Sequence, residues 1–289
     1  MKKILSIAAL ALLTFSITSC GNCSCCKKTE KRTLSQGQVR IFSHRGGRME
    51  FDENTVTAFE GSYEKGYRGY ETDIRMASDG VLILTHDSTL ERTTNGTGVL
   101  ELQSSETIKA LETKQGGKVM MFDEFVEWIA SKGDMEYVEF ELKTKPVELY
   151  PEEKLHAMCD EIWTKTQAIK PEGALFLYTS SDERGLLYLK EKYGTDDLLW
   201  IVSKPVNDET IETCLGYGIK RIGAKIEGSS RKSVQKAQEK GLIVSLWPSG
   251  SVDDIMLGIW LGSNTLCCDV PVEVKDFIEK ECPYLDIEF

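Results

Sequence analysis

Histidine is scarce in this sequence, which has three histidines and nine cysteines among 289 residues. Cys23, Cys25 and Cys26 lie close together, but no histidine or second cysteine pair stands at the spacing of a zinc site. A zinc cluster is therefore not expected. The other cysteines after position 26 are five in number, and because five is odd, they imply no complete disulfide framework.

The sequence also lacks an excess of positive charge. It has 35 Lys and Arg residues against 46 Asp and Glu residues, which gives a formal net charge of −11. An acidic surface repels phosphate backbones, so nucleic acid is not expected as a partner. An anionic substrate would therefore need a locally positive pocket. Nothing in the sequence indicates an obligate protein partner.

The N-terminal apolar run, residues 4–17, is too short to span a membrane, which takes about 20 residues. It follows two lysines and precedes small residues and Cys20, as in a secretory signal. The residues Ile17-Thr18-Ser19-Cys20 resemble the bacterial lipobox, which implies cleavage before Cys20 and lipidation of its thiol. A plain signal peptide whose cleavage point lies near a cysteine is the alternative.

We therefore expect a lipoprotein signal peptide over residues 1–19 and a flexible tether over residues 20–38, which show no apolar period. The lipobox resemblance implies an exported protein that is lipid-anchored to a bacterial membrane and faces the periplasm or the cell exterior.

From residue 39 on, short runs rich in β-branched and aromatic residues alternate with amphipathic segments. The runs predict strands at 39–43, 69–73, 81–85, 137–142, 174–178, 198–202, 219–224, 242–247 and 265–268. The segments between them predict eight helices, the first capped by Asn54 and ended before Gly66, the others at 123–132, 151–166, 182–193, 208–217, 230–240, 252–261 and 272–280. Repeated strand and helix units, eight in number, predict a (β/α)8 TIM barrel over residues 39–289.

The run 81–85 is one strand too many for eight units. It follows the turn signal Ser78-Asp79-Gly80 without room for a crossover helix, so we expect it to pair antiparallel with the second strand. Counting outward from that turn puts Glu71 and Asp73 across from residues 85–87, which include His86. A polar insertion over about residues 74–118, with one short helix at 106–111, would then lie over the barrel mouth.

Polar side chains gather at the predicted carboxyl ends of the strands, which line the active site in barrels of this type. They are His44, Arg45, Glu71, Asp73, His86, Glu139, Glu141 and Lys143. Several carboxylates inside a barrel are costly unless positive charge lies among them. Oxygen ligands favour one hard divalent cation, Ca²⁺ or Mg²⁺. Such a cation beside Arg45 and Lys143 would make a positive pocket that can bind a phosphate. The two histidines nearby could then act as proton donor and proton acceptor.

Five motifs occur in order on these strand ends: His44-Arg45-Gly46, Glu53-Asn54-Thr55, Glu71-Thr72-Asp73, His86-Asp87 and Glu141-Leu142-Lys143. Together they resemble the glycerophosphodiester phosphodiesterase family, whose barrel is similar to that of phosphatidylinositol phospholipase C. The resemblance runs from about residue 39 to the end and includes the stretch HDSTLERTTNGTG. Trp247 and Asp269-Val270-Pro271 resemble later landmarks of the family.

The resemblance implies roles for the matching residues. Glu71, Asp73 and Glu141 would be metal ligands, and His44 and His86 would be the catalytic acid and base. Arg45, Lys143, Glu53, Asn54 and Trp247 would contact or shape the substrate site. The implied reaction is hydrolysis of a glycerophosphodiester, a small-molecule substrate, to sn-glycerol 3-phosphate and an alcohol, with one divalent cation.

Several positions depart from the family pattern, among them Asp52, Met120, Cys268 and the residues after Trp247. They lie at the predicted rim of the pocket and leave the alcohol, and even the glycerol, open. An activity like that of phosphatidylinositol phospholipase C or of a lysophospholipase D therefore stays an alternative. So does a lipoprotein that binds phosphoesters without turnover.

Overall fold

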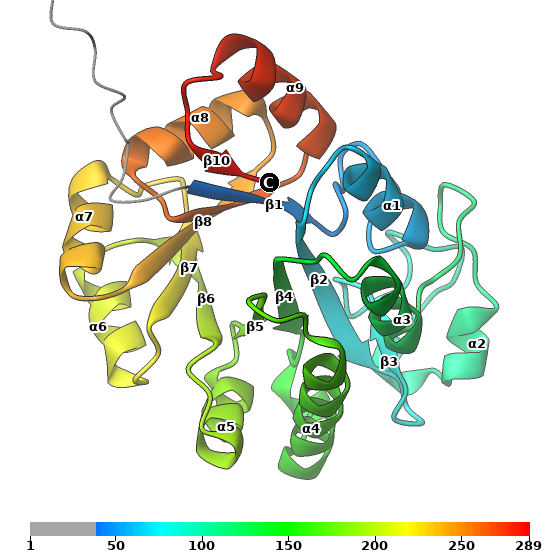
Figure 1. Ribbon diagram of the computed structural model, residues 1–289. Helices are drawn as coiled ribbons and strands as arrows, with labels where there is room; N and C mark the ends of the chain where they lie inside the picture. The colour runs from blue at the N-terminus through cyan, green and yellow to red at the C-terminus, as the bar shows by residue number, and fades with distance from the viewer. Residues whose placement is uncertain (1–38) are drawn as a thin grey trace, which may run out of the picture. The chain divides into compact units, whose positions relative to one another are not determined.

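Eight parallel strands form a closed barrel in the computed structural model, which describes residues 39–289 (Figure 1). They are β1 (Val39–His44), β2 (Gly69–Met76), β4 (Tyr137–Leu142), β5 (Leu175–Ser180), β6 (Leu198–Pro205), β7 (Arg221–Lys225), β8 (Ile243–Ser249) and β9 (Thr265–Cys268). Strand β1 pairs with both β2 and β9, which closes the ring. The predicted (β/α)8 fold is thus confirmed.

A helix follows each barrel strand, and the helices surround the barrel (Figure 1). They are α1 (Val56–Glu64), α3 (Phe122–Lys132), α4 (Glu152–Ile169), α5 (Glu183–Tyr193), α6 (Asp208–Gly216), α7 (Arg231–Glu239), α8 (Val252–Leu261) and α9 (Pro271–Glu281). No helix among the described residues is long and apolar enough to cross a membrane. The predicted signal peptide, the tether and Cys20 lie outside the described residues.

The cap of the first helix differs from the prediction. Thr55, not Asn54, is the N-cap of α1, and its hydroxyl accepts a hydrogen bond from the Ala58 backbone N–H. Asn54 instead has a left-handed backbone, with φ 56°, and its amide points toward strand β2. The cap prediction was wrong because Asn and Thr are both good N-cap residues and stand next to each other.

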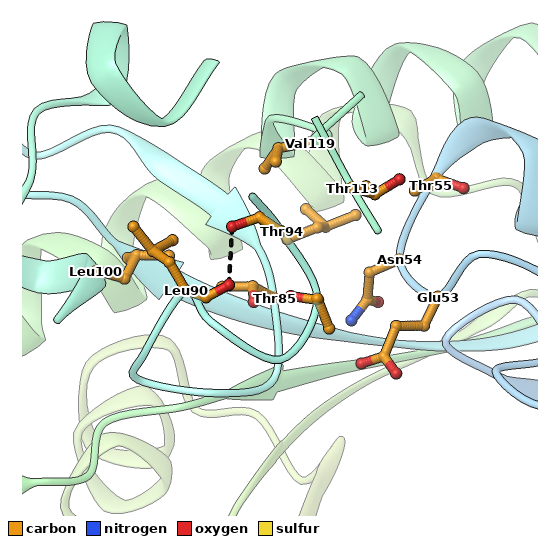
Figure 2. Close-up of a pocket in the computed structure, with 11 residues that line it drawn as sticks. Glu53, Asn54, Thr55, Thr85, Leu90, Thr94, Leu100, Thr113 and Val119 are labelled. Carbon is orange, nitrogen blue, oxygen red and sulfur yellow. Dashed lines mark hydrogen bonds between the residues drawn. The ribbon is translucent and has the colours of Figure 1, made fainter. Parts of the chain in front are cut away.

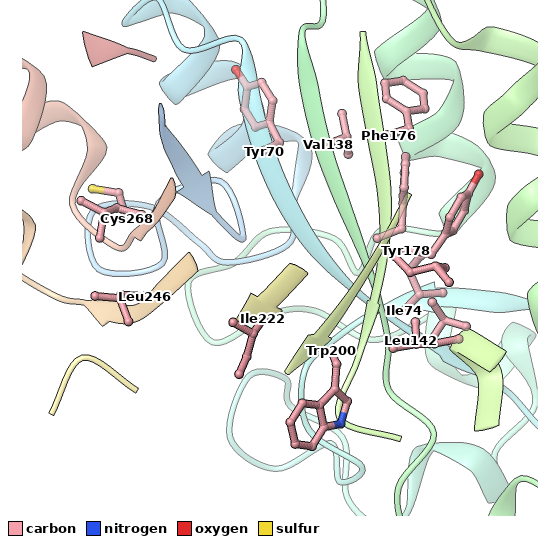
Figure 3. Close-up of a cluster of buried hydrophobic side chains, with 14 of the residues drawn as sticks. Tyr70, Ile74, Val138, Leu142, Phe176, Tyr178, Trp200, Ile222, Leu246 and Cys268 are labelled. Atoms are coloured by element: carbon pink, nitrogen blue, oxygen red, sulfur yellow. The ribbon is translucent and has the colours of Figure 1, made fainter. Parts of the chain in front are cut away.

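Side chains alternate between the outside of the barrel and its interior. Figure 3 shows outward side chains, Tyr70, Val138, Phe176 and Leu246 among them, in the large apolar cluster that also includes helix residues. The inward positions of β2 and β4 carry acids instead, and the register pairs Glu71 with Glu139 and Asp73 with Glu141. Glu139 and Glu141 thus share one face of β4, as the alternation of side chains along a strand requires.

Strand β3 (Leu82–Leu84) folds back antiparallel on β2, as the turn signal predicts. Ile74 pairs with Leu84, and the Thr85 backbone N–H donates to the Asp73 carbonyl over 3.0 Å, which brings the segment with His86 beside β2. The chain that follows contains η2 (Leu100–Leu102) and α2 (Ser105–Lys109), and α2 begins and ends slightly earlier than the predicted helix at 106–111.

The segment after β3 has a small apolar cluster of its own. It is made of Ala77, Ile83, Leu90, Leu100, Ile108, Val119 and Met121. Two further short elements were not predicted: η3 (Val147–Leu149) and β10 (Ile287–Glu288), which pairs with the start of β1.

Candidate active site

The turn after β1, residues 45–47, requires glycine at two positions. Arg45, Gly46 and Gly47 all have left-handed backbones, with φ of 53°, 79° and 99°. A Cβ on Gly46 would lie 2.5 Å from the Cβ of Ala58 in α1, and one on Gly47 would lie 2.6 Å from Pro271 in α9. Only glycine fits this close approach, and the turn holds the backbone of Arg45 beside Glu71.

His44 is held by a buried aspartate. Its Nδ1 lies 2.5 Å from Asp269 Oδ1, and Arg48 donates to both oxygens of the same carboxylate, over 2.7 and 2.6 Å. Burial raises the pKa of Asp269, but His44 and Arg48 more than offset this and hold it below its usual range. The carboxylate thus accepts the Nδ1 proton and leaves Nε2, which is 3.6 Å from Glu71 Oε2, for other chemistry.

Three buried carboxylates lie together next to His44. Single oxygens of Glu71, Asp73 and Glu141 lie within 4.8 Å of one another, which is within reach of one ion. Arg45 Nε is 2.9 Å from Asp73, while Lys143 Nζ is 3.1 Å from Asp73 and 2.7 Å from Glu141. Glu71 Oε1 is buried without a hydrogen-bond partner among the residues that the structure describes.

The electrostatics of these carboxylates favour a cation. Burial and the neighbouring Asp73 and Glu141 raise the pKa of Glu71 well above its usual value. Burial alone would also raise the pKa of Asp73, but Arg45 and Lys143 hold it well below. Two side-chain cations are thus insufficient for three carboxylates, and the all-oxygen donor set with its unpartnered oxygen fits a hard divalent ion.

His86 is held by an aspartate and an arginine, as His44 is. Its Nδ1 lies 2.6 Å from Asp87, and Arg92 Nε donates to the other oxygen of Asp87 over 2.5 Å. Arg92 also makes two hydrogen bonds with Glu53, of 2.7 and 2.8 Å, and Glu53 reaches Arg45 over 3.2 Å. One network of charges therefore joins the two histidine segments.

Burial lowers the pKa of both histidines below 6.5, with Arg45 adding to the effect at His44. The attraction of Asp73 opposes this at His86, and the attraction of Asp269 opposes it at His44. Burial thus favours the neutral form of both imidazoles, while the neighbouring carboxylates favour the charged form.

One cavity of about 450 Å³ collects most of the predicted residues. His44, Arg45, Glu71, His86, Glu141, Lys143 and Trp247 line it, and Asp73 is buried beside them, paired with Arg45 and Lys143. Its remaining wall is partly apolar and includes Leu199, Ile201 and Pro248. The arrangement combines positive side chains, a carboxylate group and two oriented imidazoles at one barrel mouth.

Glu53 and Asn54 do not line this cavity. Figure 2 shows both on the loop before α1, beside a separate space of about 20 Å³ that also borders Thr85 and Thr94 and has room for a single water. The Asn54 amide donates to Asp73 over 2.9 Å and accepts from Thr72 over 2.9 Å. These two residues hold Arg45 and Asp73 in place, so direct contact with substrate stays a prediction.

Sequence reasoning gave no role to four residues of the site: Arg48, Asp87, Arg92 and Asp269. Signals were available for three of them, because Asp269 directly follows the last barrel strand, and Asp87 and Arg92 belong to the HDSTLERTTNGTG stretch. Glu139, which lies on the same face as Glu141, accepts a hydrogen bond from the Tyr137 hydroxyl, and burial raises its pKa to about 7.

The fold and the site define a TIM-barrel protein with a carboxylate-rich, locally positive site at the carboxyl ends of its strands. Residues 44–273 match the glycerophosphoryl diester phosphodiesterase family, and this chain belongs to that family.

Curated relatives are similar over parts of the chain. A glycerophosphodiester phosphodiesterase of Caldanaerobacter subterraneus subsp. tengcongensis is 37% identical over 124 residues, which are 40% of this chain and 50% of the relative. Human glycerophosphodiester phosphodiesterase 1 is 40% identical over 74 residues, which are 26% of this chain and 22% of that protein. The aligned segments thus span half or less of these relatives.

Solved structures are similar over most of the barrel. A structure from Silicibacter pomeroyi matches with a TM-score of 0.77 and 20% identity over 88% of this chain and 97% of that one. An Oleispira antarctica phosphodiesterase in complex with the product sn-glycerol-3-phosphate matches with a TM-score of 0.72 and 18% identity, over 84% and 97%. At these identities the likeness establishes the fold.

Proposed function

We propose that this protein hydrolyses glycerophosphodiesters to sn-glycerol 3-phosphate and an alcohol, with one divalent cation, Ca²⁺ or Mg²⁺. The observation that carries the proposal is that His44 and His86, each held at Nδ1 by an aspartate, line the same cavity as Glu71 and Glu141. Membership in the family supports it, as does the product bound in the Oleispira relative.

The cation would be held by Glu71, Asp73 and Glu141, whose oxygens lie within reach of one ion. When bound, it would supply positive charge that stabilises the negative charge developing on the phosphoryl oxygens. Lys143 and Arg45 add positive charge beside the same place, and together they make a local site for an anion inside an acidic protein.

The two imidazoles would carry the proton transfers. One imidazole acts as the base, and its unprotonated Nε2 takes a proton from the nucleophile. The other acts as the acid in its imidazolium form, with a proton on both nitrogens, and its Nε2–H gives a proton to the departing alkoxide, which is otherwise a poor leaving group. Asp269 and Asp87 fix the Nδ1 proton on each ring, so that Nε2 is the nitrogen that exchanges protons. Either water or the adjacent hydroxyl of the glycerol can serve as nucleophile in this arrangement, and trapping a cyclic phosphate intermediate would identify the hydroxyl.

The N-terminal sequence supports a location for this activity. The layout of residues 1–20 favours export, lipidation at Cys20 and a position on a bacterial membrane that faces the periplasm or the cell exterior. Incorporation of labelled palmitate into the wild-type protein, and its loss in Cys20→Ala, would be the expected result. Equal labelling of the two proteins would contradict the lipid anchor.

The activity itself is tested with purified protein and a panel of glycerophosphodiesters, phosphatidylinositol and a lysophospholipid, by measuring release of sn-glycerol 3-phosphate and of the free alcohol. We expect release of sn-glycerol 3-phosphate that stops with chelator and returns with Ca²⁺ or Mg²⁺. His44→Ala and His86→Ala should each abolish turnover. His156→Ala is the matched control, because His156 lies on α4 and stacks on Tyr188, away from the cavity.

Each other outcome of this assay identifies an alternative. Release of a lysophosphatidic acid or of an inositol phosphate, with no release from glycerophosphodiesters, would replace the proposed substrate. Binding of glycerophosphodiesters without any turnover, unchanged in both histidine variants, would indicate a binding protein rather than an enzyme.

A further inference from the structure

Cys267 lies at the floor of the candidate active site. It is an inward-facing residue of β9, between the outward-facing Leu266 and Cys268, and it lines the 450 Å³ cavity. Its neighbours inside the barrel form a small apolar cluster that includes Phe42 and Leu199. The proposed hydrolysis does not use the Cys267 thiol.

Three different kinds of metal ligand meet at this floor. Ligand atoms of His44, Glu71 and Cys267 lie within 4.8 Å of one another. Bonds of about 2.0–2.3 Å from a tetrahedral zinc ion place its ligands roughly 3.3–3.8 Å apart, so only small side-chain movements would be needed to close around an ion. The distance between His44 Nε2 and Glu71 Oε2, 3.6 Å, is already in that range.

The surroundings of His44 favour this use of its ring. Asp269 occupies Nδ1, which leaves the lone pair of Nε2 directed away from the aspartate and toward Glu71. A carboxylate on the far nitrogen is the usual support of a histidine that binds a metal, because it fixes the ring and makes Nε2 a better ligand. Glu71 Oε1 is also buried without a hydrogen-bond partner among the described residues.

We propose that His44, Glu71 and Cys267 form a second cation site, selective for thiophilic ions such as Zn²⁺ and Cd²⁺, whose occupancy inhibits the enzyme. Sulfur and imidazole ligands favour these ions, whereas Ca²⁺ and Mg²⁺ take oxygen ligands. The new site shares Glu71 with the carboxylate group and takes Nε2 of His44 away from proton transfer. Binding forms metal bonds to sulfur, nitrogen and oxygen and releases the thiol proton to solvent.

Cd²⁺ titration of the full-length protein tests binding without reference to activity, because a cadmium–thiolate bond absorbs in the ultraviolet. The wild type and Cys267→Ser share every other cysteine, including those before residue 39, so the difference spectrum reports one thiol. We expect the variant to lose one equivalent of this absorption, and Cys268→Ser, whose side chain faces outward, to keep it. Identical spectra for the wild type and Cys267→Ser would overturn the site.

The inhibitory effect rests on the proposed function and is measured separately. With each protein normalised to its own rate without Cd²⁺, Cys267→Ser should need at least about tenfold more Cd²⁺ for half inhibition, and raising Ca²⁺ should weaken inhibition of the wild type through Glu71. Equal Cd²⁺ sensitivity of the two proteins would overturn the inhibition. Circular dichroism checks their folding, and Cys267→Ala repeats the comparison if the serine variant is unfolded.

The two experiments keep the two proposals apart. A wild type that shows the Cys267-dependent absorption but no phosphodiesterase activity supports the metal site and contradicts the proposed function. A wild type that is active but lacks the Cys267-dependent absorption supports the proposed function and contradicts the metal site.

Discussion

His44 Nδ1 lies 2.5 Å from Asp269 Oδ1, although 225 positions separate the two residues in the sequence. They meet because β1 and β9 are neighbours in the closed barrel, so that their carboxyl ends lie side by side. His86 has the same kind of partner in Asp87, the next residue along the chain. Each aspartate is in turn bound by an arginine, Arg48 or Arg92, so the two histidines have equivalent supports from unrelated parts of the sequence.

Asp269→Asn tests the support of His44. An amide can place its NH₂ group toward Nδ1 and stabilise the wrong tautomer of the ring, so we expect kcat to fall by about 10- to 100-fold with a smaller effect on KM. Steady-state kinetics of sn-glycerol 3-phosphate release measures both. Asp160→Asn is the control, because Asp160 lies on α4, accepts hydrogen bonds from Tyr188 and Tyr193 and does not line the cavity, so kcat should stay that of the wild type. An unchanged kcat for Asp269→Asn would show that the aspartate has no part in positioning His44.

Glu71→Gln tests the carboxylate group as the site of the hard cation. Loss of one charged ligand should raise the Ca²⁺ or Mg²⁺ concentration for half-maximal activity by at least about tenfold. Glu139→Gln is the matched control. Glu139 stands beside Glu71 in the register of β2 and β4, but it accepts a hydrogen bond from the Tyr137 hydroxyl and is not one of the three grouped carboxylates. The same change in metal requirement for both variants would contradict the assignment.

Gly46→Ala tests the close approach of the turn to α1. The new Cβ would meet Ala58, and the position has φ 79°, so we expect both a steric clash and backbone strain, together about 2–5 kcal/mol in the free energy of unfolding. Gly80→Ala separates the two effects, because Gly80 has φ 88° with nothing within 4 Å of a Cβ, and should cost only about 1–2 kcal/mol. Urea unfolding of both variants gives the comparison, and equal losses would rule out the clash.

Arg75→Met tests a buried ion pair behind the site. Arg75 donates to the His86 carbonyl over 3.0 and 2.8 Å and to Glu101 over 2.6 Å, which ties the His86 segment to η2. Glu101 would then stay buried without a positively charged partner, with only the Tyr150 hydroxyl donating to it within residues 39–289, which should cost about 3–5 kcal/mol of unfolding free energy and also lower kcat. Lys204→Met, which breaks the exposed pair with Glu209, should cost less than about 1 kcal/mol. A loss for Arg75→Met as small as that of Lys204→Met would contradict the prediction.

The barrel could be predicted from the sequence because its signals are local. Each strand is a short apolar run, each helix has its own period, and the turn at Ser78-Asp79-Gly80 was sufficient to place His86 beside β2. The alternation of side chains along β4 likewise puts Glu139, Glu141 and Lys143 on one face, and all three line the cavity. Residues whose positions follow from regular backbone geometry could therefore be placed from the sequence.

The partners of the histidines could not be found in this way. No spacing rule connects His44 with Asp269, because their contact depends on closure of the ring and on the side-chain conformations of both. Arg92 reaches Glu53 and Asp87 from a long irregular segment whose path has no period. Asn54 shows a further limit: it resembles a helix cap in the sequence, but its left-handed backbone turns its amide toward Asp73 and leaves capping to Thr55.

The decisive measurement is a crystal structure of the protein grown with Ca²⁺ and sn-glycerol 3-phosphate. We expect one ion bonded to oxygens of Glu71, Asp73 and Glu141, and a phosphate within hydrogen-bond reach of His44 and His86. An ion bound away from these three carboxylates, or a phosphate outside the cavity that the two histidines line, would contradict it.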